Sequence, residues 1–252
     1  MRDDVVIQER YGERSEEYFW NTASDDVVMA VLTPALRAMT TARRPLRVLD
    51  VGCGPGNTLR RLQPWGQTFG AEYSEVGLSV ARRRGLTRLV AADSLRLPFS
   101  AETMDCVLAL DVIEHVKDDI AALREAHRLL RPGGVLVLTV PAFMSLWRSH
   151  DELYGHYRRY SKAALLAAVR AAGFATERCE FTKCLFYFPL LVRARLDRAR
   201  KGDAPGGDDF FDIPSWLNTM LRWQIVWEHR LRIGRILPVG VTLVWMGRRP
   251  AR

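Results

Sequence analysis

A glycine-rich turn directly after an apolar run constrains this chain more than any other feature. Residues 48–51 read Val-Leu-Asp-Val, and three glycines follow at every second position, Gly52, Gly54 and Gly56. Glycine accepts positive φ angles and lets the backbone approach a ligand without a Cβ in the way. The pattern predicts a buried parallel strand, a tight turn and a helix that begins at Asn57. It also predicts a ligand at the carboxyl end of that strand, where open α/β sheets bind theirs.

Two common nucleotide-binding turns do not match this run. A phosphate-binding loop requires Gly-Lys followed by Ser or Thr, but here Gly56 is followed by Asn57 and Thr58. The dinucleotide fingerprint is G-x-G-x-x-G, and its last two glycines are spaced more widely than those of this turn. The turn therefore belongs to neither of these two motifs.

Strand-like and helix-like segments alternate along most of the chain. The expected strands cover residues 47–51, 67–73, 87–92, 104–110, 135–140, 174–181 and 241–246. The expected helices cover residues 57–62, 75–84, 118–130 and 161–172. Such alternation favours a mainly parallel sheet with helices on both faces. We therefore expect an α/β fold with a seven-stranded, mostly parallel sheet.

Two regions lie outside this alternation. Residues 1–45 read as helical, with aromatic residues between charged ones, and are expected to form an N-terminal helical lid. Residues 46–252 form the expected main domain, with a helical insertion over residues 182–240 between the last two strands. The flanks of this insertion, 185–200 and 216–235, are rich in aromatic residues and arginine at roughly helical spacing.

Composition narrows the class of protein. A length of 252 residues fits one α/β domain with an insertion. The four cysteines show no metal-binding or redox spacing and are expected to be free thiols in a reducing compartment. The N-terminus has no signal-peptide pattern, and the apolar run at 184–192 is too short to span a bilayer. We therefore expect a cytoplasmic protein.

Positive charge is concentrated near the C-terminus. The net charge is +8, and residues 182–252 hold thirteen Lys and Arg against six Asp and Glu. A solvated face is the ordinary explanation of such a bias. The alternative is attraction to an anionic partner, and peripheral contact between the basic, aromatic insertion and a membrane surface is one such case.

The glycine turn and the strand before it resemble motif I of the class I S-adenosylmethionine-dependent methyltransferases. Further segments resemble other motifs of this family: Ala91–Leu95 after the third strand, Asp105–Val116 on the fourth, and Leu129–Gly134 at the turn into the fifth. The resemblance covers about residues 45–180. It implies a Rossmann-like methyltransferase fold, with S-adenosyl-L-methionine as cofactor and S-adenosyl-L-homocysteine as product.

The resemblance also implies where each part of the cofactor binds. Glu72 corresponds to the acidic residue that accepts both ribose hydroxyls at the end of the second strand. Asp93 is expected to accept the adenine amino group. Main-chain amides of the glycine turn are expected to hold the methionine end. The full expected set is Asp50, Gly52, Cys53, Gly54, Gly56, Glu72, Tyr73, Asp93, Ser94, Leu110 and Asp111.

Histidines, arginines and aromatic residues are concentrated in residues 149–161, after the fifth strand. This segment resembles a subgroup of bacterial methyltransferases with an H-D-E-x-x-G-H-x-R-R-Y pattern, and we expect it over the mouth of the cofactor pocket. Histidine can take a proton near neutral pH, and arginine can bind a carboxylate or phosphate. The expected catalytic residues are His115, His150, His156 and Tyr160. The expected acceptor-binding residues are Tyr11, Trp20, Asp151, Arg158 and Arg159.

A structural explanation of the same segment stays open. It reads equally as a polar loop that caps the next helix, with Ser161 as the N-cap residue and Tyr160 as a core residue. For the cluster as a whole we favour a functional role, because several groups that carry chemistry occur together.

Asp111, Glu114 and His115 form a D-x-x-E-H pattern whose members share one face if the segment is helical. Ubiquinone-type O-methyltransferases have a similar set, which is linked to magnesium. Two carboxylates suit Mg²⁺, but this ion seldom relies on histidine. The pattern leaves three interpretations open: a metal site, a basic His115, or a residue that only begins a helix.

Together these patterns predict an S-adenosylmethionine-dependent methyltransferase that methylates an oxygen atom of a small-molecule or peptide acceptor. An anionic group such as a carboxylate is expected near the site, because Arg158 and Arg159 follow His156 closely. Three alternatives remain: a lipid or polyprenyl acceptor at a membrane, a nucleic acid, and a non-catalytic protein that keeps the cofactor fold. The lack of an N-P-P-Y-type motif disfavours a nucleic-acid partner, and the intact glycine turn disfavours the non-catalytic protein.

Overall fold

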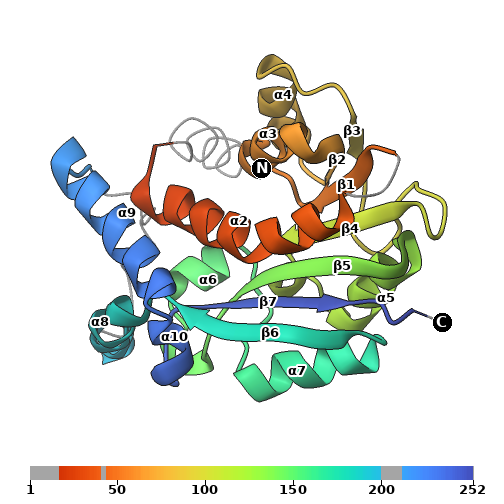
Figure 1. Cartoon of the computed structure of the whole chain (residues 1–252). Helices are drawn as coiled ribbons and strands as arrows, with labels where there is room; N and C mark the ends of the chain where they lie inside the picture. The colour runs from red at the N-terminus through yellow and green to blue at the C-terminus, as the bar shows by residue number, and fades with distance from the viewer. Residues whose placement is uncertain (1–16, 41–43, 200–211, 252) are drawn as a thin grey trace.

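The computed structural model describes residues 17–40, 44–199 and 212–251. Seven strands form one sheet in the order β3-β2-β1-β4-β5-β7-β6, seen across the molecule in Figure 1. The strands are β1 Leu46–Val51, β2 Gly66–Glu72, β3 Leu89–Ala91, β4 Met104–Leu110, β5 Leu130–Pro141, β6 Ala175–Thr182 and β7 Thr242–Arg248. Neighbouring strands run parallel except β7, which is antiparallel to β5 and β6. The expected seven-stranded, mostly parallel sheet is thus confirmed.

Helices cover both faces of this sheet. Figure 1 shows α2 Phe19–Met39 above the central strands and α7 Lys162–Ala171 below them. Successive residues of a strand point to opposite faces, so Val48 packs with α2 whereas Leu49 packs on the side of α7. This double burial explains why the central strands are apolar at almost every position. The other helices of the framework are α3 Asn57–Leu62, α4 Glu75–Arg83, α5 Asp119–Leu129 and α6 Ser149–Leu153.

Helix α2 is a layer of the core and not a separate lid. Eight of its side chains are buried, and they pack with strands β1, β4, β5 and β7 in one cluster. The expected lid is therefore wrong for residues 19–39, because their apolar stripe covers the sheet. Residues 1–16, which include the expected acceptor-binding residue Tyr11, lie outside the described residues.

The insertion lies at the carboxyl edge of the sheet. Strands β5 and β6 are parallel to each other because both are antiparallel to β7, so the chain leaves β6 at the edge where β5 also ends. The Val241 amide donates a hydrogen bond to the Thr182 carbonyl oxygen at 3.1 Å. The insertion therefore leaves and rejoins the sheet at adjacent points. Its helices, at the left of Figure 1, are α8 Tyr187–Ala199, α9 Ser215–Arg230 and α10 Ile233–Ile236.

The insertion also packs on α2. The Asn218 side chain on α9 accepts a hydrogen bond from the Phe19 amide at 2.8 Å. It therefore satisfies one of the N–H groups that have no partner within the first turn of α2. Among the described helices, none is long and apolar enough to cross a membrane.

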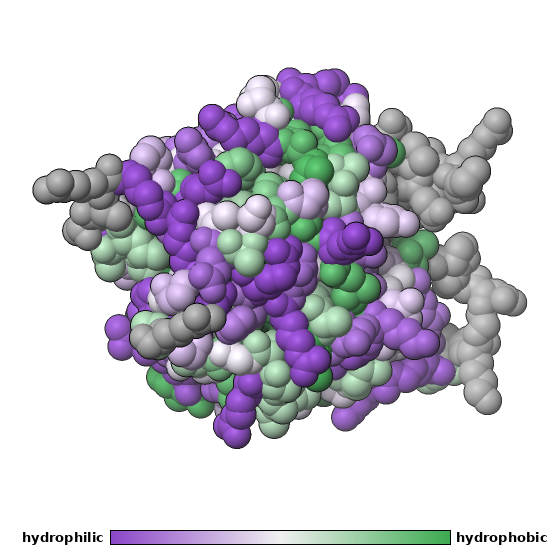
Figure 2. Space-filling view, turned by 90° about the vertical axis from the view of Figure 1, so that its right-hand side faces the viewer, coloured by the Kyte–Doolittle hydropathy of each residue, from purple (hydrophilic) through white to green (hydrophobic). Residues whose placement is uncertain are grey.

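The opposite edge of the sheet is held by ion pairs. Asp105, near the start of β4, accepts hydrogen bonds from the guanidinium groups of Arg44 and Arg131. Figure 2 shows the molecule from this side, where hydrophilic residues predominate and hydrophobic ones are interspersed among them. A ligand is expected at the carboxyl edge instead, as in other open α/β sheets.

Candidate functional site

The glycine turn has the conformation that its sequence predicts. Gly52 and Gly54 have φ angles of 69° and 49°. A Cβ at Gly52 would lie 2.5 Å from Val112 Cγ2, whereas a Cβ at Gly54 would meet no atom within 4 Å. Gly52 is therefore required by its neighbours, and Gly54 borders open space in which a ligand can approach the backbone.

The main-chain amides of this turn, expected to hold the methionine end of the cofactor, have partners within the protein. Each is already a donor inside the protein: Gly52 and Cys53 to the Ala71 carbonyl, Gly54 to a Glu72 carboxylate oxygen, and Gly56 to the Cys53 carbonyl. The expectation that these amides hold the methionine end is wrong, because pairing with β2 continues past the end of β1. Carbonyl oxygens and the Cα surface of the turn remain for a ligand.

Cys53 belongs to the core and not to a ligand surface. Its side chain is buried in a small cluster with Leu59, Ala81 and Leu86. Burial, with the charges of Asp50 and Glu72, raises the pKa of its thiol far above the ordinary range. The expected role of Cys53 in cofactor binding therefore has no support from its side chain or its amide.

Glu72 presents a carboxylate in a fixed position. Its two oxygens accept hydrogen bonds from the Gly54 and Ser74 amides, both at 2.8 Å. Each carboxylate oxygen has a second lone pair, so the group can still accept hydroxyl groups. Tyr73 beside it is 83% exposed, and Leu95 in the next loop is 42% exposed. These exposed apolar surfaces suit a flat ring.

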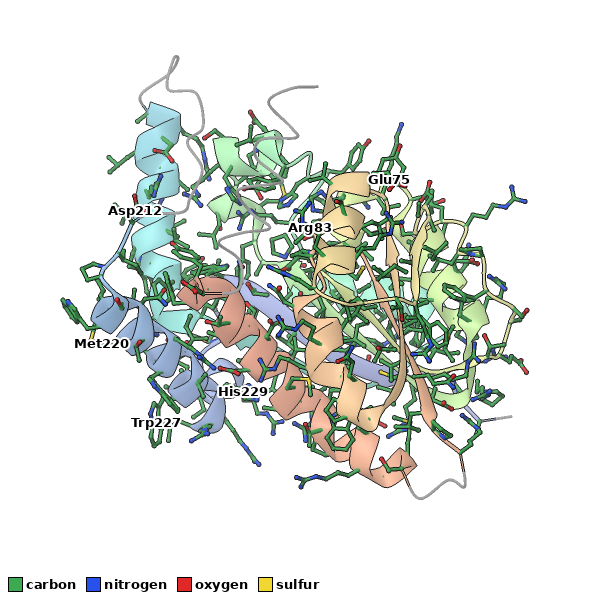
Figure 3. All side chains as sticks on the ribbon, turned by 90° about the horizontal axis from the view of Figure 1, so that it is seen from above. Glu75, Arg83, Asp212, Met220, Trp227 and His229 are labelled. Atoms are coloured by element: carbon green, nitrogen blue, oxygen red, sulfur yellow. The ribbon has the colours of Figure 1, made fainter. Side chains whose placement is uncertain are left out.

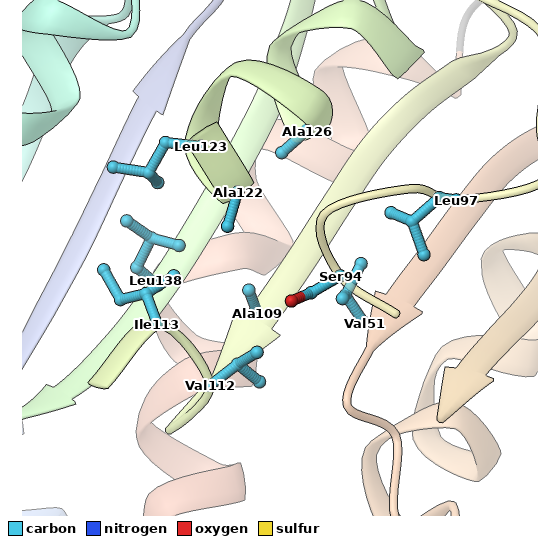
Figure 4. A pocket seen from close by; sticks show the side chains of 10 residues that line it. All are labelled: Val51, Ser94, Leu97, Ala109, Val112, Ile113, Ala122, Leu123, Ala126 and Leu138. Carbon is cyan, nitrogen blue, oxygen red and sulfur yellow. The ribbon is translucent and has the colours of Figure 1, made fainter. Parts of the chain in front are cut away.

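The loop after β3 closes over a small gap in the core. Asp93 caps this loop by accepting the Leu95 amide at 2.9 Å. Beneath it, Ser94 and Val112 border a mainly apolar cavity of about 10 Å³, shown in Figure 4. This volume is that of roughly one water molecule. The cavity cannot hold a nucleobase, and the expected contact of Asp93 and Ser94 with an adenine ring stays a prediction.

Acidic groups gather below the turn. Asp50 ends β1 almost fully buried, and burial with the charges of Asp25 and Glu72 raises its pKa well above the usual value. Asp25 on α2 accepts a hydrogen bond from the Thr58 hydroxyl at 2.8 Å, and burial raises its pKa too. A cationic ligand would relieve this crowding of carboxyl groups. Sequence reasoning missed Asp25 and Thr58, because two adjacent acids on a helix look like ordinary surface residues.

The groups around the glycine turn fit S-adenosylmethionine, whose methionine end carries an ammonium and a sulfonium. The open face at Gly54 gives access to the backbone. Asp25 and Asp50 are carboxyl groups whose pKa burial raises and which a bound cation would help to ionise, and Glu72 can accept hydrogen bonds from a ribose diol. Leu110 and Asp111, at the end of β4, complete the same edge.

Three residues other than glycine adopt left-handed backbone conformations after three strands that end at this edge. Asp111 follows β4 with φ 52°, Phe143 follows β5 with φ 57°, and Lys183 follows β6 with φ 58°. Such conformations cost energy for residues with a Cβ and are concentrated at functional sites. The rim of the carboxyl edge is thus a strained part of the backbone.

Lys183 is buried within this rim. Its side chain is 1% exposed, and its Nζ lies 4.0 Å from the centroid of the Trp20 ring. Burial lowers its pKa to about 8, although the charges of Asp111 and Asp25 act in the opposite direction. Trp20 also packs against Phe186 at 5.4 Å between ring centroids. Trp20 therefore lies at the carboxyl edge as part of the packed structure, where its expected contact with an acceptor stays a prediction.

The two arginines expected to bind an acceptor are used inside the protein. Arg159 forms two hydrogen bonds to the fully buried Asp151, at 2.7 and 2.8 Å. Arg158 lies 3.0 Å from Asp119 Oδ2 and also donates to the Lys117 carbonyl. The Arg159 guanidinium is buried against Asp151, so its expected role toward an anionic acceptor is wrong, whereas the role of the partly exposed Arg158 stays a prediction. Pairing with carboxylates is the usual way to bury such charges.

Tyr160 and Asp151 are likewise structural residues. The Tyr160 hydroxyl donates to Asp119 at 2.6 Å, and burial first, then this carboxylate, raises its pKa far above the ordinary value. The expected catalytic role of Tyr160 is therefore wrong, because its phenol stays a neutral donor in the core. Ser161 accepts the Ala164 amide and caps α7, as the structural explanation predicted. Asp151 is covered on all sides and is not exposed to an acceptor.

Three groups remain at the centre of the acceptor side: Glu114, His115 and His156. Their ligand atoms lie within 4.8 Å of one another. Desolvation and the neighbouring His156 lower the pKa of His115 to about 4, although part of the ring is exposed. Burial and the charge of Asp111 raise the pKa of Glu114 well above its usual value. His150 lies beside this cluster, with its ring centroid 6.5 Å from that of His156.

Comparison with known proteins identifies the family. A methyltransferase-domain family model matches residues 28–178, more than half of the chain. A malonyl-[acyl-carrier protein] O-methyltransferase of Enterobacter lignolyticus is 36% identical over 146 residues, which cover 54% of this chain and 57% of that protein. A 27-O-demethylrifamycin SV methyltransferase of Amycolatopsis mediterranei is 31% identical over 144 residues, 53% of each chain. The match thus spans about half the length of these curated relatives.

Solved structures share the fold at lower identity. The [4+2]-cyclase SpnF has a TM-score of 0.56 at 23% identity, covering 92% of this chain and 84% of that one. An S-adenosylmethionine-dependent methyltransferase of Mesorhizobium loti has a TM-score of 0.55 at 22% identity, covering 86% and 97%. These likenesses confirm the Rossmann-like methyltransferase fold. The chain belongs to the methyltransferase-domain family, and S-adenosylmethionine is its cofactor.

Proposed function

We propose that the protein transfers a methyl group from S-adenosylmethionine to an oxygen atom of a small-molecule or peptide acceptor. The observation that carries this proposal is the cluster of Glu114, His115 and His156 at the acceptor side of the cofactor edge. The bound cofactor supplies a methyl group on a positively charged sulfur. A hydroxyl acceptor must be positioned in line with that bond and must lose its proton, so it needs a basic group nearby.

The cluster supplies that basic group. His156 Nδ1 lies 2.8 Å from Asp151 Oδ1. Burial would raise the pKa of Asp151, but hydrogen bonds from His156 and Arg159 outweigh it and hold the pKa well below its usual range. The ionised Asp151 therefore fixes the proton of His156 on Nδ1 and leaves the lone pair of Nε2 for an acceptor. His115, neutral at pH 7, offers a second uncharged ring.

The names of two relatives support oxygen as the atom that is methylated. Both match about half of this chain and are named for O-methylation or for an O-demethylated substrate. The proposal does not include an anionic acceptor, because Arg158 and Arg159 are paired with Asp119 and Asp151.

The test is methyl transfer from labelled S-adenosylmethionine to fractions of a cell extract, followed by mass spectrometry of the labelled product. We expect release of S-adenosylhomocysteine and a methyl ether or ester. His156→Gln should lower the rate by at least about 100-fold, whereas His127→Ala, a histidine on α5 beside Phe174, should leave it unchanged. A label found on nitrogen or carbon would contradict the proposal.

A second proposal concerns where the acceptor is met. Trp216, Met220, Trp223 and Trp227 follow helical spacing along α9, and each is more than half exposed. Figure 3 shows Met220 and Trp227 pointing away from the body of the molecule. Arg230 lies over the rings of Trp223 and Trp227, at 6.0 and 5.8 Å. An apolar stripe with arginine beside it suits an anionic bilayer surface, so a lipid or polyprenyl acceptor at a membrane is the second candidate.

Sedimentation with vesicles tests this second candidate. We expect binding to vesicles with anionic headgroups, weaker binding in high salt, and little binding to neutral vesicles. The double variant Trp216→Ser/Trp227→Ser should lose this binding. Equal sedimentation of the double variant and the unchanged protein would reject the stripe as a membrane surface.

A further inference from the structure

Glu114 is fully buried, and its carboxyl group has no hydrogen-bond partner among the described residues. By contrast, Asp151 accepts bonds from Arg159, His156 and the Arg148 amide. An unsatisfied buried carboxyl group is costly and therefore points to a ligand.

Two imidazole rings meet this carboxyl group. The ligand atoms of Glu114, His115 and His156 lie within 4.8 Å of one another, and the two rings stand edge to face with centroids 4.5 Å apart. One carboxylate and two imidazoles from nearby segments form a recurring ligand set for zinc and for iron in enzymes.

The surroundings hold one of these ligands in place. His156 Nδ1 is hydrogen-bonded to Asp151 Oδ1 at 2.8 Å, so Nε2 is the ring nitrogen left for an ion. Histidine ligands of metals almost always make such a bond through the other ring nitrogen. The Tyr157 amide donates to the Glu114 carbonyl at 2.8 Å and ties the two segments together. The orienting acid and the backbone link therefore hold His156 and Glu114 next to each other before any ion binds.

We propose that Glu114, His115 and His156 bind one divalent transition-metal ion of the zinc class. Nitrogen and oxygen ligands lie about 2.0–2.2 Å from a zinc ion. Binding would therefore draw the three ligand atoms closer together than they are in this structure. His115 is exposed, and its ring would have to leave its hydrogen bond with the Tyr154 main chain to turn toward the ion. Two nitrogen ligands disfavour Mg²⁺, which prefers oxygen and water. Asp111, part of the pattern first noted in the sequence, is outside this set.

This inference deepens the proposed function and rests on it for its role in catalysis. Three protein ligands leave a coordination position open. An acceptor hydroxyl at that position would give its proton to solvent water more easily, because a bound cation lowers the pKa of a hydroxyl group. Its oxygen would then bond to the methyl carbon as the bond from that carbon to sulfur breaks, and S-adenosylhomocysteine would leave. The metal would then take over the direct contact between the acceptor and His156.

The test is metal binding and not activity. The full-length, tag-free protein is treated with a chelator and titrated with Zn²⁺ by calorimetry and with Co²⁺ by visible absorption. We expect one ion per chain and the absorption bands of four-coordinate Co²⁺. His115→Ala and Glu114→Gln should each weaken Zn²⁺ binding by more than about 100-fold, and Asp151→Asn by about 10- to 100-fold. Mg²⁺ should give no comparable heat.

The controls separate a failed metal site from a failed function. His127→Ala, far from the cluster beside Phe174, should bind Zn²⁺ like the unchanged protein. His115 is exposed, so its alanine variant should keep the fold, and S-adenosylmethionine binding checks this independently. Absence of Zn²⁺ binding, or equal binding by His115→Ala, would overturn the proposal while leaving cofactor binding and methyl transfer open to their own tests.

Discussion

The two sides of the carboxyl edge are built in different ways. The cofactor side consists of a glycine turn and a few acids. Gly54 in the turn borders open space, and Glu72 presents a fixed carboxylate beside it. The acceptor side consists of side chains that bind each other, above all the buried pair of Asp151 and Arg159. Substitutions on the first side should therefore change ligand binding, whereas many on the second should change folding as well.

The largest effect should come from breaking the buried pair. Asp151→Ala leaves Arg159 buried without its carboxylate, and we expect the free energy of unfolding to fall by about 3–5 kcal/mol. Urea denaturation at pH 7 measures it. The double variant Asp151→Leu/Arg159→Met removes both charges and should recover a large part of the loss. A loss below about 1 kcal/mol in the single variant would show that the acceptor side does not depend on this pair.

Gly54→Ala should separate binding from folding on the cofactor side. The added Cβ enters the space that borders the turn, and we expect S-adenosylmethionine affinity to fall about 100-fold in calorimetry, roughly 2.7 kcal/mol. Gly133→Ala is the matched control, because Gly133 also has a positive φ with no atom near its Cβ, but lies at the other edge. Both variants should lose similar stability. If Gly133→Ala lowered the affinity for S-adenosylmethionine as much as Gly54→Ala, the argument for Gly54 would fail.

The stability of the protein should depend on pH through the buried Lys183. Its pKa is about 8 in the folded protein against an ordinary value of 10.5, so the unfolded chain binds more protons between these pH values. Stability contributed through Lys183 therefore rises with pH from about 8 to 10.5. At pH 7 the free energy of unfolding of Lys183→Met should exceed that of the unchanged protein by about 1–3 kcal/mol. This gain in stability should shrink toward pH 10. A gain that stays constant with pH would contradict a buried charge.

The smallest effect should come from Tyr160→Phe. The variant removes one hydrogen bond to Asp119, which keeps its contact with Arg158. We expect a loss of about 0.5–1.5 kcal/mol in stability and an unchanged rate of methyl transfer, measured by release of S-adenosylhomocysteine. A large loss of rate with intact stability would return Tyr160 to the catalytic residues.

Local patterns in the sequence determined the cofactor side well. The predicted helix start at Asn57 agrees with the first residue of α3, and the predicted strand at 104–110 agrees with β4 at both ends. The glycine turn and its φ angles follow from residue type alone. Only the use of its amides differed, because the hydrogen bonds to Ala71 depend on the neighbouring strand.

The acceptor side was less predictable, because its chemistry depends on contacts between distant segments. Arg158 and Asp119 are 39 positions apart, and no spacing rule connects them. Lys183 looked like the start of a basic, solvated insertion, yet it packs under Trp20 from the other end of the chain. His156 joins Glu114 and His115 in place of Asp111 for the same reason.

The hydrogen bond between the Val241 amide and the Thr182 carbonyl joins the two ends of the insertion at the sheet. The pairing of β7 with β5 and β6 lies outside this segment. The insertion is nevertheless tied to the cofactor side, because Asn218 accepts the Phe19 amide and Arg222 pairs with Asp26 on α2. A change in α9 should therefore reach the helix that carries Asp25.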